Sequence, residues 1–128
     1  MILLTPEEIV DLHERLVAAT GGSHGLRDQG LLESAVHSAS AAYDHEEVYP
    51  TVEEKAARLA YSLVSNHAFI DGNKRIGIYV MLMTLSMAGI SLRYEQAELI
   101  ALGLGLADGS LKYEEALDWI NRHNSKEG

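Results

Sequence analysis

The sequence predicts an all-α fold, a single compact helical bundle of about six helices around a buried central helix at residues 73–88. Apolar residues recur at helical spacing in several segments. Only 2 prolines interrupt the chain, which leaves room for long helices. The composition, 47% hydrophobic and 23% charged, is that of an ordinary globular protein. At this length we expect residues 1–128 to form one domain with one continuous core.

Charge and composition exclude several classes of function. The net charge of −9 argues against direct contact with nucleic acid, so a partner chain would have to supply any such contact. The absence of cysteine excludes disulfides, thiolate metal sites and a cysteine nucleophile. The start of the chain lacks the basic and apolar regions of a signal peptide. The apolar run at 76–88 is shorter than the roughly 18 to 20 residues of a membrane span. We expect a soluble, cytoplasmic protein.

The first helix is expected to begin after Thr5. Thr5 suits the N-cap, Pro6 suits the first turn, and Glu8 completes a capping box. Gly21 and Gly22 should end this helix. The apolar positions that recur along it at helical spacing are Ile9, Leu12, Leu16 and Val17.

A second helix is expected after Asp28, which suits its N-cap. Arg27, in the loop before it, allows two interpretations: it contacts a substrate or partner, or it pairs with a nearby carboxylate. His13 and His24 lie on or beside the first helix, and we expect solvated or half-packed side chains without a function.

A polar connector at 43–49 leads to a third helix. Its acidic and histidine run at 44–47 is expected to be a solvated charge cluster rather than a metal site, because consecutive side chains point in different directions. Thr51 and Glu54 repeat the capping box of the first helix. The third helix should present His67 at or just past its last turn.

The later part of the chain predicts three further helices. Residues 76–88 are apolar nearly all round, which indicates a helix buried in the middle of the bundle. A fifth helix is expected at 95–107, although Gly103 and Gly105 each lower its stability by about 1 kcal/mol relative to alanine. Ser110 is the expected cap of the last helix.

Residues 67–75, His-Ala-Phe-Ile-Asp-Gly-Asn-Lys-Arg, combine several features of a phosphate site. The turn leads directly into a helix, so backbone N–H groups and the positive helix end converge on one spot. Gly72 lets the backbone approach a phosphate, and Asn73 either holds the loop or donates to an oxygen. Lys74 and Arg75 supply cations that stabilise charge on a transferred group.

The same stretch contains a base and a carboxylate. His67 is suited to take a proton from a hydroxyl near neutral pH, and Asp71 is suited to hold Mg²⁺. Phe69 is expected to anchor the loop in the core. The same residue types would occur in an ordinary turn with a helix-capping histidine and two flanking cations. Residue types alone therefore do not decide between phosphate binding and a structural turn.

The stretch resembles the signature of the Fic/Doc superfamily, His-x-Phe-x-(Asp/Glu/Asn)-(Gly/Ala)-Asn-(Gly/Lys)-Arg, and within it the Doc (death-on-curing) branch, which has lysine where Fic proteins have glycine. The Thr-Pro-Glu-Glu opening and residues 22–35 are also Doc-like. The resemblance implies the Fic/Doc fold and a nucleotide-dependent transferase that modifies a protein hydroxyl. In it His67 would activate the acceptor, Asp71 would hold the metal, and residues 72–75 would bind the phosphates.

Doc-type toxins are described as kinases that phosphorylate elongation factor Tu, arrest translation and are restrained by an antitoxin. The resemblance therefore implies ATP, Mg²⁺, elongation factor Tu and an antitoxin acting in trans. Lys74 and Ile78 depart from the Fic pattern and favour phosphoryl transfer over AMP transfer. No Fic-type inhibitory motif precedes His67, so we expect inhibition to come from a separate antitoxin chain. We expect a segment of this antitoxin to fold into an apolar groove. AMP transfer and an inactive binding module are the alternatives.

Overall fold

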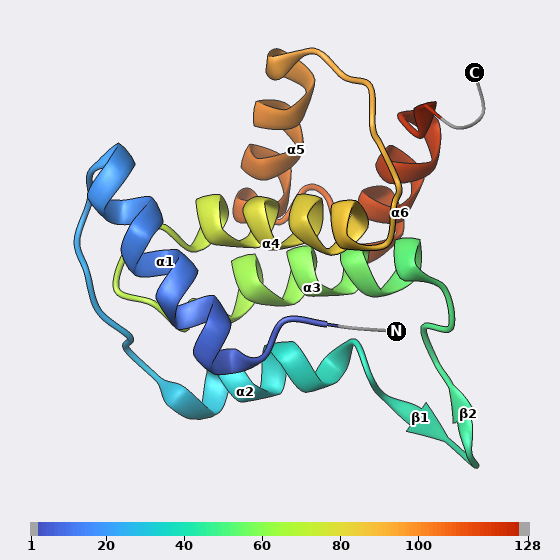
Figure 1. Ribbon diagram of the computed structural model, residues 1–128, viewed down its shortest axis with the longest axis horizontal. Helices are drawn as coiled ribbons and strands as arrows, with labels where there is room; N and C mark the ends of the chain where they lie inside the picture. The colour runs from blue at the N-terminus through green and yellow to red at the C-terminus, as the bar shows by residue number, and fades with distance from the viewer. Residues whose placement is uncertain (1–2, 126–128) are drawn as a thin grey trace.

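Helices α3 and α4 lie antiparallel at the centre of the computed structural model, which describes residues 3–125 (Figure 1). Helices α1 and α2 pack on one side of this pair, and α5 and α6 on the other. This arrangement confirms the predicted all-α bundle. The helices of the described part are α1 (Pro6–Thr20), α2 (Gln29–Ser38), α3 (Val52–Asn66), α4 (Asn73–Met87), α5 (Gln96–Asp108) and α6 (Tyr113–Arg122).

The predicted caps of the first three helices are confirmed. The Thr5 hydroxyl accepts from the Glu8 N–H (3.1 Å), and the Glu8 carboxylate accepts from the Thr5 N–H (2.8 Å). Thr51 and Glu54 form the same reciprocal pair, and Asp28 caps α2. Caps of this kind each contribute about 1 kcal/mol, so these helix starts are fixed by local sequence.

The predicted cap of the last helix is wrong. Helix α6 begins at Tyr113. Ser110 lies in the preceding turn, where its N–H donates to the Asp108 carboxylate (2.8 Å). Glu115 secures the actual start, because its carboxylate accepts from the Lys112 N–H (2.7 Å). An acidic residue in the first turn has replaced the serine cap.

The polar connector forms a small hairpin of strands β1 (Ala42–Tyr43) and β2 (Glu46–Glu47) (Figure 1). Its turn residues Asp44 and His45 have left-handed φ angles of 52° and 68°. The buried ammonium of Lys55 donates to the Glu47 carboxylate (2.8 Å) and so ties the hairpin to α3. Within residues 3–125 no group of three or more His, Cys, Asp or Glu side chains is placed to hold a metal ion.

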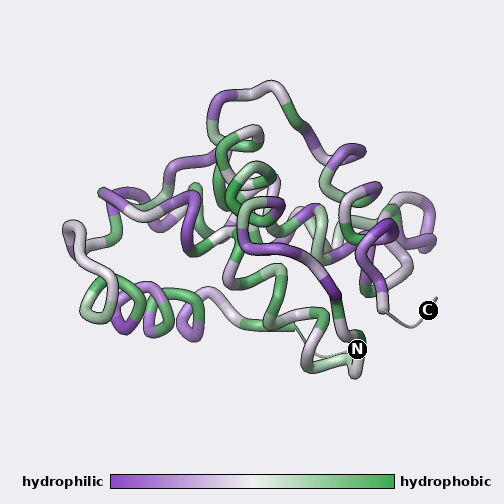
Figure 2. Tube along the Cα trace, turned by 90° about the horizontal axis from the view of Figure 1, so that it is seen from above, coloured by the Kyte–Doolittle hydropathy of each residue, from purple (hydrophilic) through white to green (hydrophobic). Residues whose placement is uncertain are grey.

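Two clusters of buried side chains flank the α3–α4 pair, and Figure 2 shows the alternation of hydrophobic and hydrophilic residues along the helical turns. Gly77 lets the two central helices approach closely, because a Cβ there would lie 2.6 Å from Val64 Cγ2. Fully buried members of the two clusters include Ile9, Leu32 and Ile76 on one side and Met81, Leu102 and Ile120 on the other.

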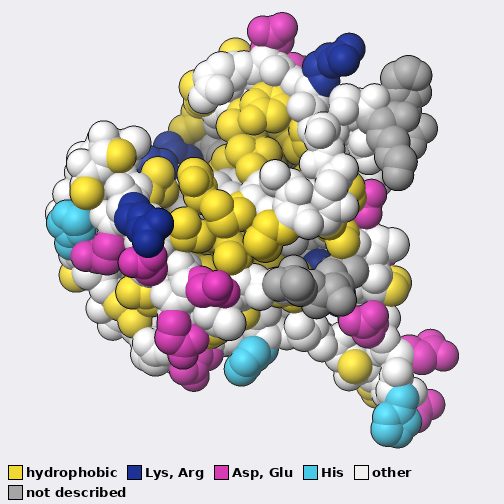
Figure 3. Space-filling view, in the orientation of Figure 1, with side chains coloured by type: hydrophobic (Ala, Val, Ile, Leu, Met, Phe, Trp, Pro, Cys, Tyr) yellow, Lys and Arg dark blue, Asp and Glu magenta, His cyan; other side chains and the backbone are white. Residues whose placement is uncertain are grey.

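Helix α4 is central, as predicted. The sequence also suggested burial on nearly all sides, but one side of α4 is open. Val80 and Met81 are buried, whereas Tyr79 is 42% exposed. The open side, with Ile78 and Leu82, forms the floor of a groove between α1 and α5, where hydrophobic side chains gather (Figure 3). The sequence pattern did not indicate that this side would be left uncovered by the helices of residues 3–125. No helix in the described part of the chain is long and apolar enough to span a membrane.

Candidate active site

The loop between α3 and α4 begins at His67, which ends α3 as predicted. His67 has φ 51° and ψ 49°, a left-handed conformation that disfavours a residue with a side chain by roughly 1–2 kcal/mol. The Arg27 guanidinium stabilises it by donating from Nε to the His67 carbonyl oxygen (2.9 Å). Arg27 thus holds backbone, which neither sequence interpretation anticipated. The His67 side chain is exposed and lines a cavity at the start of α4.

Residues 25–28 brace the loop from one side. The Arg27 and Asp28 N–H groups both donate to the Ala68 carbonyl oxygen (2.7 and 3.0 Å), and the Ile70 N–H donates to the Gly25 carbonyl oxygen (3.1 Å). These backbone contacts join segments that lie far apart in the sequence. The position of the loop therefore depends in part on the segment that precedes α2.

Asn73 braces the loop from within. Its Oδ1 accepts from the Phe69 N–H and its Nδ2 donates to the Phe69 carbonyl oxygen, both at 3.0 Å. Of the two roles predicted for Asn73, its side chain performs the holding role. Phe69 is 2% exposed, which confirms it as the apolar anchor.

Helix α4 begins without a side-chain cap. Its N-cap is Gly72, with φ 77°, which has no side chain to form a cap hydrogen bond. Within residues 3–125 no hydrogen bond is found from the N–H groups of Asn73, Lys74 and Arg75, which lie at the positive end of a 15-residue helix. This end faces a cavity of about 450 Å³, which is lined by Val64, His67, Ile70, Asp71, Gly72, Asn73, Lys74, Arg75 and Ala107.

Asp71 is a half-exposed, ionised carboxylate at the same spot. Its Oδ2 accepts from the Ser23 N–H (3.0 Å) and its Oδ1 from the Gly72 N–H (2.8 Å). These backbone hydrogen bonds, that of Ser23 foremost, hold the pKa of Asp71 below its ordinary value. A carboxylate has about four lone-pair sites, so both oxygens can still bind a cation. One carboxylate together with substrate phosphates suits Mg²⁺.

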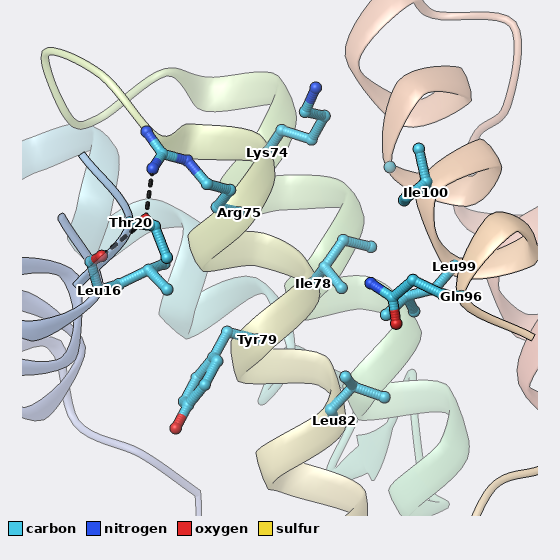
Figure 4. Close-up of a pocket in the computed structure, with 11 residues that line it drawn as sticks. Leu16, Thr20, Lys74, Arg75, Ile78, Tyr79, Leu82, Gln96, Leu99 and Ile100 are labelled. Atoms are coloured by element: carbon cyan, nitrogen blue, oxygen red, sulfur yellow. Dashed lines mark hydrogen bonds between the residues drawn. The ribbon is translucent and has the colours of Figure 1, made fainter. Parts of the chain in front are cut away.

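Arg75 ties the start of α4 to the end of α1. Its Nη1 donates to the Thr20 hydroxyl (2.6 Å) and to the Gly21 carbonyl oxygen (2.7 Å), and Figure 4 shows the guanidinium turned towards Thr20. Its Nη2 lies 3.9 Å from Asp71 Oδ2. The guanidinium thus lines the cavity, with one nitrogen engaged in the scaffold and the other near the carboxylate.

Lys74 is placed differently from its neighbour. No hydrogen bond or ion pair of its ammonium is found within residues 3–125. Its side chain extends towards α5 (Figure 4), where Gly103 leaves room for it, since a Cβ there would lie 3.2 Å from Lys74 Cγ. Lys74 is therefore a cation available to a ligand, and the glycine in α5 has a role that the sequence pattern did not suggest.

A substitution at Gly103 should separate stability from activity. Gly103→Ala raises helix propensity by about 1 kcal/mol but crowds the Lys74 stem. We expect an unchanged or raised melting temperature together with an activity roughly fivefold lower, which corresponds to about 1 kcal/mol of the barrier. Ala101→Gly, on the exposed side of α5, should lower stability without this loss of rate. A Gly103→Ala variant as active as wild type would contradict this role for Gly103.

His13 is the residue at this site that sequence reasoning missed. It was expected to be solvated or half-packed, but it is fully buried, with Nε2 2.7 Å from the Asp71 carbonyl oxygen. Its spacing of four residues from Ile9 and from Val17 would have placed it on the buried side of α1. His24, in contrast, is half-exposed as expected and pairs with a carboxylate of α1.

A model of the Fic/DOC family matches residues 3–85, which include the whole loop between α3 and α4. The chain belongs to the Fic/DOC family. It is similar to a protein of Escherichia phage P1 named Protein kinase doc, with 29% identity over 119 residues that cover 93% of each chain. It is also similar to Toxin Doc of Mycolicibacterium smegmatis, with 39% identity over 88 residues, or 66% of this chain and 68% of the relative. Both relatives confirm the resemblance to the Doc branch.

Proposed function

We propose that this protein is a cytoplasmic Doc-type toxin that transfers the γ-phosphoryl group of ATP to a Ser or Thr hydroxyl of elongation factor Tu and so arrests translation. The observation that carries the proposal is the start of α4, which shares one cavity with an exposed imidazole, an ionised carboxylate and an ammonium without a partner among residues 3–125. The names of the relatives, a kinase and a toxin, support this reaction class.

In the proposed reaction the phosphates of ATP bind at the N–H groups of residues 73–75. His67 takes the proton of the acceptor hydroxyl, the hydroxyl oxygen forms a bond to the γ-phosphorus, and the bond to the bridging oxygen breaks, so ADP leaves with the electron pair. The Lys74 ammonium and the backbone N–H groups stabilise the charge that develops. The Arg75 guanidinium adds positive charge beside them.

Mg²⁺ is the metal that suits this site. Asp71 would hold it, because an ionised oxygen ligand beside a phosphate-binding turn is the donor that this cation prefers. When bound, the ion neutralises charge on the phosphate oxygens. The contribution of the chain is to keep the carboxylate ionised and oriented by the Ser23 and Gly72 N–H groups.

Lys74 supports phosphoryl transfer over AMP transfer. Its stem occupies the space between α4 and α5 beside the cavity, which a glycine at this position would leave open to phosphates. Ile78 lies in the apolar groove, where the longer Fic motif would supply a second arginine. With ATP labelled at the γ-phosphate, elongation factor Tu should become labelled. Label appearing only from the α-phosphate would establish AMP transfer instead.

We propose that the antitoxin binds in the groove between α1, α4 and α5. The groove has a volume of about 320 Å³ and ends at Lys74 and Arg75, so an occupant would lie against the phosphate site. Its walls are apolar, and the exposed side chains of Ile100 and Leu104 extend the apolar surface along α5. A helical segment with an apolar face fits such a groove.

A charge placed in this groove should uncouple inhibition from catalysis. Ile100→Glu should keep toxicity, because Ile100 lies outside the phosphate site. The antitoxin candidate is the protein whose co-expression restores growth of cells that express the wild type. It should no longer inhibit Ile100→Glu, because burying an unpaired carboxylate is unfavourable. Val48→Glu, an equally exposed apolar residue at the hairpin, is the matched control and should still be restrained. Full restraint of Ile100→Glu would place the antitoxin elsewhere.

A further inference from the structure

His13 makes contacts with two different residues of the active-site loop. Its ring is stacked on Phe69, with centroids 3.9 Å apart and planes inclined by 13°. Its Nε2 lies 2.7 Å from the Asp71 carbonyl oxygen, across 58 positions of sequence. The side chain is 0% exposed. A buried polar ring of α1 thus reaches the residue that supplies the proposed metal ligand.

The hydrogen bond defines which ring nitrogen carries hydrogen. A carbonyl oxygen only accepts, so Nε2 must be the donor. Nδ1 is buried without a hydrogen-bond partner in the described structure and lies 3.5 Å from Glu14 Oε2. An unsatisfied buried polar atom costs about 1–3 kcal/mol. A phenylalanine could also stack on Phe69 but has no donor, so the specific contribution of the imidazole is the Nε2–H donor.

The Asp71–Gly72 peptide depends on this donor more than the rest of the loop does. Ala68, Phe69 and Ile70 are each held through their own backbone groups by residues 25–28 or by Asn73. Within residues 3–125, the one hydrogen bond found to the Asp71 carbonyl oxygen is that from His13. The Gly72 and Ser23 N–H groups both donate to the carboxylate of Asp71, so the contact from His13 is the one that holds its main chain.

We propose that His13 is a positioning residue: it holds the Asp71 carbonyl oxygen and so fixes the main chain from which the Asp71 carboxylate, itself held by the Ser23 and Gly72 N–H groups, reaches the metal. The inference rests on the proposed function, in which Asp71 holds the Mg²⁺ of Mg·ATP. Replacing a residue that hydrogen-bonds to a metal ligand and orients it typically lowers metal affinity or activity by about 10- to 100-fold. His13 acts through Asp71 and does not touch the substrate.

The test compares Mg·ATP binding by calorimetry for wild type, His13→Phe and His13→Gln. His13→Phe keeps an aromatic ring against Phe69 but removes the donor, and it should bind Mg·ATP at least about tenfold more weakly. Binding of ATP in the presence of EDTA should change much less, because the defect lies at the metal ligand. His13→Gln restores an N–H donor and should recover affinity to within about threefold of wild type.

Each outcome of this test has a defined meaning. Wild type without affinity for Mg·ATP would refute the proposed function itself. Wild type that binds, together with a folded His13→Phe of equal affinity or a His13→Gln as weak as His13→Phe, would refute the role of His13 alone. If His13→Phe fails to fold, ¹⁵N NMR of the wild-type histidines decides: a hydrogen on Nε2 of His13 supports the role, and an unprotonated Nε2 overturns it.

Discussion

Replacing His67 should abolish phosphoryl transfer while leaving the protein folded. A positioned general base contributes roughly 10²- to 10⁴-fold, and the His67 imidazole is the exposed base that lines the cavity at the start of α4. His67→Ala is therefore expected to lose activity by that factor and to lose toxicity on expression. The measurement is the rate of label transfer from γ-labelled ATP to elongation factor Tu.

The backbone at this position calls for a second variant. Because His67 has a left-handed conformation, alanine there also destabilises the turn, whereas asparagine adopts that conformation more readily. His67→Asn should be as inactive as His67→Ala but melt closer to wild type. His37→Ala, at an exposed histidine of α2, is the matched control and should remain active. Activity of His67→Asn equal to wild type would end the assignment of His67 as the base.

Replacing Lys74 should give the second-largest loss. Removing one preorganised donor from a site of developing charge typically lowers the rate on the order of 10²-fold. Lys74→Ala is expected to lose activity by this amount without loss of stability, because its ammonium makes no hydrogen bond or ion pair within residues 3–125. Steady-state rates at saturating ATP, together with thermal melts, measure both effects.

Controls for Lys74 separate its charge from its geometry. Lys74→Arg keeps the charge but places a wider group in the space beside Gly103, so we expect only partial recovery. Lys112→Ala removes an exposed lysine at the start of α6 and should leave the rate unchanged. A Lys74→Ala variant with the wild-type rate would show that the backbone N–H groups of α4 suffice for the phosphates.

Sequence reasoning predicted well those features that depend on neighbouring residues. The caps at Thr5, Asp28 and Thr51 are set within one helical turn, so local residue types were enough. The same holds for His67 at the end of α3 and for the glycine turn that opens α4. The two-residue strands of the hairpin are too short to show a period, which is why they were not predicted.

Features that depend on contacts between distant segments were not predicted. The buried contact of His13 with Asp71 and the hydrogen bond of Arg75 to Thr20 join α1 to the start of α4. Arg27 holds the His67 carbonyl oxygen across 40 positions. Such contacts arise only when the helices pack; the spacing along a single segment indicates that His13 is buried but not which residue it contacts. The proposed chemical groups of the site thus come from one short stretch of sequence, whereas the contacts that hold them in place come from distant segments.

Phosphoryl transfer at the start of α4 is tested most directly by the intact mass of elongation factor Tu after incubation with the purified protein, ATP and Mg²⁺. We predict that the mass increases by one phosphoryl group with the wild-type protein and not with His67→Asn. An elongation factor of unchanged mass with folded, Mg·ATP-binding wild-type protein, or one that gains AMP, would contradict phosphoryl transfer to this substrate at the start of α4.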